Sequence, residues 1–252
     1  MRSSVKIFCA FLILILVINS VPCSAQDAKG FAVIELFTSE GCKSCPPADK
    51  ILSEISADAQ KNNKEIYCLA FHVDYWNRLG WKDPYSKFQY TRRQENYSRV
   101  LPSKELYTPQ VVVNGKIEFT GSKKEKSNEA IEAALKRPST IQLSIQVDSM
   151  LNDTAYISWK LSKTDKNNVL QMAFTESGLV SNVNKGENAG KTLQHDHIVR
   201  VFTAINNPGN TGQVKMILKG RDRELQSEIV AFIQHKQNYS IAAAARIKNP
   251  GK

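Results

Sequence analysis

Apolar residues in the first half of the chain follow two different periods. Residues 31–37 and 66–73 are short, almost wholly apolar runs, which predicts two buried strands. Between the two runs, apolar residues recur at the spacing of an amphipathic helix: Ala48, Ile51, Leu52, Ile55 and Ala59. Strand, helix and strand in this order are typical of an α/β unit.

The next part of the chain completes this unit. Residues 110–114 and 116–120 are strand-like and meet at Asn114-Gly115, which predicts a hairpin with a tight turn. Residues 128–136 predict a closing helix, and residues 87–99 predict a helix inserted before the hairpin. We therefore expect a small mixed sheet with helices against it.

The pattern changes after Pro138, and we place a domain boundary near Arg137. Beyond it, short alternating segments are separated by Asn, Asp and Gly turns. Seven of them predict strands: 141–147, 155–161, 169–174, 198–202, 214–218, 229–233 and 240–245. So many short strands favour an antiparallel sandwich-like domain over residues 138–252.

Composition and charge narrow the function classes. The chain has 42% hydrophobic residues, enough for a real core, and a net charge of +10. It has neither an Arg-rich helix nor a basic stripe interleaved with aromatic residues, so we expect no nucleic-acid partner. The positive charge is better explained as a solvated, Lys-rich surface.

The first residues predict export. Arg2 and Lys6 precede an apolar run at residues 7–18, and Cys23-Ser24-Ala25 provides small residues for cleavage before Gln26. The run is shorter than the roughly 20 residues that span a bilayer. We expect residues 1–25 to be a signal peptide, a periplasmic or extracellular location, and no stable membrane insertion after processing. Anchoring through a lipidated Cys23 is the less favoured alternative, because Pro22 fits that cleavage site poorly.

Cysteine usage then points to redox chemistry. Cys9 and Cys23 leave with the signal peptide, and the mature chain keeps Cys42, Cys45 and Cys68, too few for a disulfide scaffold. Cys68, within a predicted strand, is expected to be a buried small hydrophobe.

Cys42 and Cys45 are spaced as a Cys-x-x-Cys pair between a predicted strand and a predicted helix. The helix N-terminus and Lys43 stabilise a thiolate, so we expect an exposed, attacking Cys42 and a shielded, resolving Cys45. An inert disulfide and half of a zinc site are the alternatives. The chain has no second Cys-x-x-Cys, which disfavours zinc.

A second motif, Tyr107-Thr108-Pro109-Gln110, leads directly into the predicted hairpin. Together with the dithiol and its helix, it resembles the thioredoxin superfamily. That resemblance implies a cis peptide bond before Pro109 beside the dithiol, and a Thr108 backbone that binds substrate peptide. It also implies a buried acid that exchanges a proton with Cys45, and Glu35 is the candidate.

A closer resemblance extends over nearly all of the mature chain. It rests on residues 35–49, 72–76, 79–84, 107–110 and 186–190, which are similar to the exported, uncharacterised family called domain of unknown function 1223. The resemblance implies an α/β thioredoxin-like domain at residues 26–137 with an inserted helical segment, followed by the all-β sandwich-like domain. It implies a redox role and no particular substrate.

Polar and aromatic residues follow the second predicted strand, where loops approach the dithiol. His72, Asp74, Trp76 and Trp81 are candidates for a substrate-binding cap, with His72 or Asp74 assisting proton transfer. The alternative is that the aromatic residues only pack against the inserted helix. His195 and His197 are expected to be polar surface residues.

These features predict an exported thiol–disulfide oxidoreductase that needs no cofactor and no metal. Its partners would be protein or small-molecule thiols and disulfides, with an unidentified redox partner. Two other functions stay open: a non-catalytic binding module with a structural disulfide, and a copper carrier that uses Cys42, Cys45 and His72.

Overall fold

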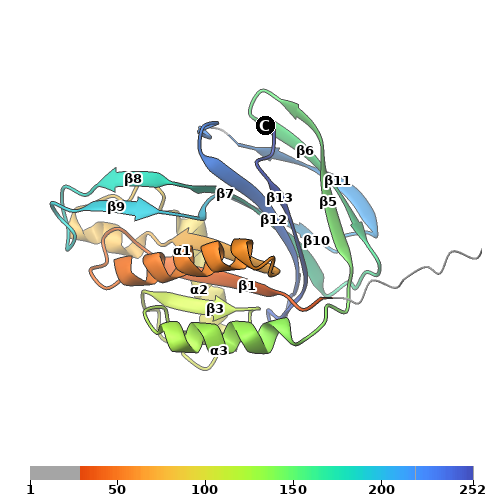
Figure 1. Ribbon diagram of the computed structural model, residues 1–252, viewed down its shortest axis with the longest axis horizontal. Helices are drawn as coiled ribbons and strands as arrows, with labels where there is room; N and C mark the ends of the chain where they lie inside the picture. The colour runs from red at the N-terminus through yellow and green to blue at the C-terminus, as the bar shows by residue number, and fades with distance from the viewer. Residues whose placement is uncertain (1–28, 219, 252) are drawn as a thin grey trace, which may run out of the picture.

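The computed structural model describes residues 29–218 and 220–251 (Figure 1). The predicted signal peptide at residues 1–25, Cys23 included, lies outside the described residues. Within them, none of the helices combines the length and the apolar character that crossing a bilayer requires.

The first half of the described chain contains the predicted elements. They are β1 (Ala32–Thr38), α1 (Pro46–Lys61), β2 (Ile66–His72), a 3₁₀ turn η1 (Tyr75–Leu79), α2 (Phe88–Val100), β3 (Gln110–Val113), β4 (Ile117–Thr120) and α3 (Lys124–Leu135). The predicted hairpin turn is confirmed, because Asn114 and Gly115 both have positive φ angles. A Cβ atom at Gly115 would lie 1.9 Å from the Tyr239 carbonyl oxygen, so the turn admits only glycine there.

The second half consists of strands. They are β5 (Leu143–Leu151), β6 (Thr154–Leu161), β7 (Asn168–Ser177), β8 (Leu179–Asn182), β9 (Thr192–His195), β10 (Ile198–Asn206), β11 (Thr211–Ile217), β12 (Gln226–His235) and β13 (Ile241–Lys248). The seven predicted strands correspond to β5, β6, β7, β10, β11, β12 and β13. The short strands β8 and β9 were not predicted.

The predicted fold class is wrong. The protein is mostly β, and its main element is one mixed sheet of eight strands in the order β13-β12-β7-β10-β2-β1-β3-β4. Strands from both sides of residue 137 thus share a single sheet, instead of an α/β thioredoxin-like domain followed by a separate sandwich. The two halves meet where β10 pairs parallel with β2, at Ile198 and Ala70.

Three apolar cores lie around this sheet. The even-numbered residues of β1 and β2 face α1 and α3, and the odd-numbered residues face α2. The three-stranded sheet β11-β6-β5 packs over β7, β12 and β13 through the third core (Figure 1). The physical reason for the wrong fold class is that periodicity identifies strands but does not identify their partners.

The two faces of β1 fix where its polar residues point. Thr38 shares the α1 face with Ile34 and Leu36, whereas Glu35 shares the α2 face with Val33 and Phe37. Because the C-terminal end of β1 leads into the Cys-x-x-Cys segment and then into α1, the α1 face is the one nearest to the cysteines.

Candidate functional site

Cys42 and Cys45 form a disulfide at the junction between β1 and α1, with Cα atoms 5.4 Å apart. Cys45 is the N-cap of α1, and Pro46 and Pro47 open the helix, where their missing N–H groups cost nothing. The expected exposure of Cys42 is wrong, because both cysteines are completely buried. Cys68 is a free, buried cysteine, as predicted.

The loop between β8 and β9 forms hydrogen bonds with the backbone around Cys42. We call residues 183–191 the Asn188 loop. The Asn188 side-chain amide, itself completely buried, donates hydrogen bonds to the Glu40 and Cys42 carbonyl oxygens at 2.8 and 3.0 Å. The Lys43 N–H donates to the Glu187 carboxylate at 3.0 Å. A segment nearly 150 residues away in sequence therefore closes over Cys42.

Thr108 and Pro109 lie on another side of the same segment. The Thr108–Pro109 peptide bond is cis, which confirms that prediction. The Ser44 hydroxyl lies 3.5 Å from the Thr108 carbonyl oxygen and 3.4 Å from the Cys42 sulfur. The Trp76 indole N–H donates to the Thr108 hydroxyl at 2.8 Å, and Gly41 packs against the Trp76 side chain. Thr108, Pro109 and Trp76 are thus brought together around the cysteines.

Two buried acid–histidine pairs lie behind the disulfide. His72 Nδ1 is 2.7 Å from Asp83 Oδ2, and His195 Nε2 is 3.0 Å from Glu40 Oε1. The two imidazole rings are 5.2 Å apart, and all four side chains are at most 3% exposed. Burying a charged group without a partner destabilises the folded protein. Each of these acids is therefore stabilised by the histidine that it contacts.

Backbone and indole groups complete this cluster. The Glu40 N–H donates to Asp83 at 2.9 Å, and the Trp81 indole N–H donates to the second Glu40 oxygen at 2.7 Å. Trp81 therefore supports the acid–histidine pairs, and Gly186 of the Asn188 loop packs against it. The expectation that His195 and His197 are surface residues is wrong, because both are buried.

Asp74 and Glu35 have other partners. Asp74 accepts a hydrogen bond from the Thr91 hydroxyl at 2.6 Å, which ties the loop after β2 to α2. Glu35 forms a buried ion pair with Arg93 at 2.5 Å and accepts a hydrogen bond from Tyr97, on the face of the sheet opposite α1. The structure does not bring either acid to the disulfide.

Sequence reasoning missed several residues of this site: Glu40, Asp83, Glu187, Asn188 and His195. Asp83 and the 186–190 segment lie within motifs that were noticed, but nothing in the sequence indicated that they meet.

In the copper alternative, Cys42, Cys45 and His72 would be the ligands. Here both sulfurs are bonded to each other and His72 Nδ1 is engaged by Asp83. Among the described residues, no group of three or more Cys, His, Asp or Glu side chains is arranged to hold a metal ion.

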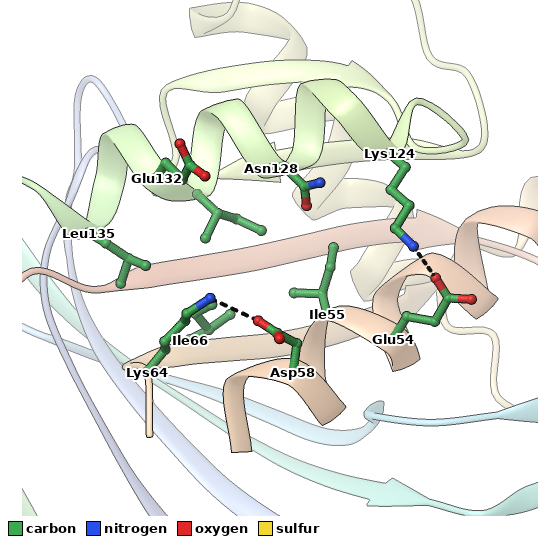
Figure 2. Close-up of a pocket in the computed structure, with 10 residues that line it drawn as sticks. Glu54, Ile55, Asp58, Lys64, Ile66, Lys124, Asn128, Glu132 and Leu135 are labelled. Carbon is green, nitrogen blue, oxygen red and sulfur yellow. Dashed lines mark hydrogen bonds and ion pairs between the residues drawn. The ribbon is translucent and has the colours of Figure 1, made fainter. Parts of the chain in front are cut away.

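A cavity of about 370 Å³ lies further along α1, between that helix and α3 (Figure 2). Figure 2 shows two ion pairs at its wall, Lys124 with Glu54 at 2.6 Å and Lys64 with Asp58 at 2.8 Å. None of the predicted site residues lines this cavity. The candidate site is therefore the disulfide and its surroundings, at the other end of α1.

Comparison with known proteins shows the family of this chain. The family described as "Protein of unknown function (DUF1223)" matches residues 33–234. The chain belongs to this family. That stretch includes both cysteines, the cis proline, both acid–histidine pairs and the Asn188 loop, so the whole candidate site lies within the DUF1223 match.

Solved structures include a protein of the same fold. The crystal structure of protein AGR_C_4864 from Agrobacterium tumefaciens is 25% identical, covers 88% of this chain and 95% of that chain, and has a TM-score of 0.65. A domain of the outer membrane lipoprotein Omp28 from Porphyromonas gingivalis is 15% identical over 43% of this chain and 87% of that chain, with a TM-score of 0.24. No curated protein matches this DUF1223 chain.

Proposed function

We propose that this protein is an exported thiol–disulfide oxidoreductase in which Cys42 attacks and Cys45 resolves. The observation that supports this most is the pair of buried acid–histidine contacts behind the disulfide, His72–Asp83 and Glu40–His195. A disulfide that only cross-links the chain needs no titratable groups beside it. Buried titratable groups that shift one another's pKa, as His72 and Asp83 do, are typical of sites that move protons.

The chemistry that we propose is exchange with a thiol or disulfide substrate. A substrate thiolate attacks the Cys42 sulfur, the bond to Cys45 breaks, and the Cys45 thiolate later displaces the substrate or is protonated. The Ser44 hydroxyl lies next to both the Cys42 sulfur and the Thr108 carbonyl oxygen. We therefore assign the substrate to this side of the disulfide. Trp76 fixes the Thr108 side chain there.

Access to Cys42 requires movement, because neither cysteine is exposed in the closed structure. The Asn188 loop is the segment that we propose moves, since it is bonded to the backbone on both sides of Cys42. Its Gly186 and Gly190 have positive φ angles of 77° and 81°, and a side chain at Gly190 would meet nothing within 4 Å. The loop therefore has room to rotate at that end.

Asn188→Ala is expected to accelerate reduction of the disulfide by roughly 10- to 100-fold. The variant loses two buried hydrogen bonds of the closed state, each worth about 1 kcal/mol, and so increases the fraction of open molecules. The measurement is the rate of reduction by dithiothreitol at fixed pH, followed by alkylation of the freed thiols. Asn182→Ala, on β8 of the same hairpin and exposed, is the control. Equal rates for all three proteins would show that this loop does not limit access.

A structural disulfide in a binding module is the second candidate, favoured by the complete burial of both sulfurs. The two functions differ in turnover. An oxidoreductase speeds the exchange between glutathione and a peptide disulfide, with repeated cycles per molecule of protein. A rate indistinguishable from the spontaneous exchange, with folded protein and reducible substrate, would favour the structural role.

A further inference from the structure

A polar patch lies between the sheet and the first turn of α1. Thr38 and His72 are register neighbours on the parallel strands β1 and β2, and both side chains point to the α1 face. They are at most 1% exposed. Among the described residues, His72 Nε2 has no hydrogen-bond partner. Unpartnered buried polar atoms are rare in folded proteins and call for an explanation.

Asp49 faces this patch from α1. Its backbone N–H donates to the Cys45 carbonyl oxygen at 3.1 Å, one turn earlier, so the side chains of the two residues are neighbours on one face of the helix. Asp49 is half-buried, and its carboxyl group is close enough to His72 and His195 to respond to their charges. A single acid thus lies one helical turn from the resolving cysteine and is influenced by the charges of both histidines.

The electrostatics of this patch favour a proton on Asp49 and a charge on His72. Burial raises the pKa of Asp49, and the charges of His72 and His195 offset only part of that rise. Burial opposes the charged form of His72, but Asp83, together with Asp49 and Glu40, outweighs burial and raises the pKa of His72. His72 also outweighs the effect of burial on Asp83 and lowers the pKa of that carboxyl.

We propose that Asp49 is the acid that protonates Cys45 when the disulfide opens, and that the positive charge of His72, which Asp83 holds in place through its hydrogen bond, stabilises the Asp49 carboxylate that remains. This step rests on the redox function proposed above. An attacking thiolate bonds to the Cys42 sulfur, the Cys42–Cys45 bond breaks, and its electron pair goes to the Cys45 sulfur, which takes the Asp49 proton. Glu35, paired with Arg93 on the other face, has no part in it.

The remaining steps complete the reduction of the disulfide. With a dithiol reductant, its second thiolate attacks the mixed disulfide and releases Cys42, which takes a proton from solvent. The reductant is oxidised to a disulfide by two electrons, and the protein's disulfide is reduced to two thiols. Asp49 regains its proton from solvent. The charged and titratable groups that face Asp49 are His72 from β2, His195 from β9, and Asp83 from the segment before α2.

The test is the pH dependence of reduction by dithiothreitol from about pH 5 to pH 9, in the full oxidised protein. The fraction of dithiothreitol that is ionised changes with pH, but it is the same for wild type and Asp49→Asn. The ratio of their reduction rates therefore does not depend on the ionisation of the reductant. We expect Asp49→Asn to be slower by roughly tenfold or more at the acidic end, where the larger fraction of wild-type Asp49 carries a proton, with the ratio approaching one at the alkaline end. Asp58→Asn, on the exposed side of α1, is the control and is expected to follow wild type.

Two further variants keep the test decisive. Asp49→Glu retains an acid and is expected to keep the pH-dependent advantage with a shifted midpoint, even if Asp49→Asn does not fold. His72→Gln removes a positive charge and is expected to move the midpoint to higher pH. A ratio that is constant over the whole pH range, or an unmoved midpoint in Asp49→Glu, would overturn the role of Asp49. A folded wild-type protein that dithiothreitol does not reduce at any pH would instead overturn the redox function.

Discussion

Cys42→Ser is expected to lower catalysed exchange between glutathione and a peptide disulfide by roughly two orders of magnitude or more, to the spontaneous rate. A hydroxyl at this position is a far weaker nucleophile than a thiolate and forms no mixed disulfide. The measurement is the initial rate at saturating glutathione, with the folded state checked by circular dichroism. The reason for choosing Cys42 is its contact with Ser44 on the side of Thr108.

Cys68→Ala is the matched control for this variant. Cys68 is the one free cysteine among the described residues and is buried on β2, where burial raises its thiol pKa to about 12. It is therefore expected to keep the wild-type rate. A Cys42→Ser protein that retained that rate would contradict the assignment of Cys42 as the attacking residue.

Arg93→Met is expected to destabilise the fold by about 3–5 kcal/mol, because it leaves the Glu35 carboxylate buried without its counter-charge. Arg93 from α2 binds both Glu35 oxygens, at 2.5 and 2.9 Å, and also contacts Gln234 on β12. Its guanidinium centre lies 4.7 Å from the Phe202 ring centroid on β10. One side chain thus joins strands from both halves of the eight-stranded sheet to α2.

The thermal midpoint measures this effect, and a fall of about 10 °C is expected for a domain of this size. The double variant Glu35→Leu/Arg93→Met is expected to recover much of the loss, since it removes both buried charges. Arg92→Met, the exposed neighbour on α2, is the control and is expected to change the midpoint little. A midpoint for Arg93→Met within about 1 °C of wild type would contradict this account of the buried pair.

Local structure could be predicted from the sequence where one short-range signal decided it. Helical spacing after Cys45 predicts α1, the apolar runs predict β1 and β2, and Asn114-Gly115 predicts the hairpin of β3 and β4. The partners of strands are a long-range property. Parallel pairing of β10 with β2 depends on contacts between residues about 130 apart, and no local pattern encodes it.

The same difference applies to the site. Cys42, Cys45 and Pro109 were identified because their spacing and context are local. The burial of Cys42 beneath Asn188 was not predicted, because the β8–β9 loop that carries Asn188 is distant in sequence. Glu35 was assigned to the disulfide from the resemblance to the thioredoxin superfamily and from its place on the strand before Cys42. Side chains alternate along a strand, and that alternation places it on the opposite face, against Arg93.

The central claim is that the Cys42–Cys45 disulfide is redox-active, and its reduction potential tests this most directly. The oxidised protein is equilibrated with graded mixtures of reduced and oxidised dithiothreitol or glutathione, and the thiol fraction is trapped by alkylation at acidic pH. The account predicts a potential in the range of known exchange proteins, about −270 to −120 mV. A potential below about −300 mV, the range of structural disulfides, would contradict it.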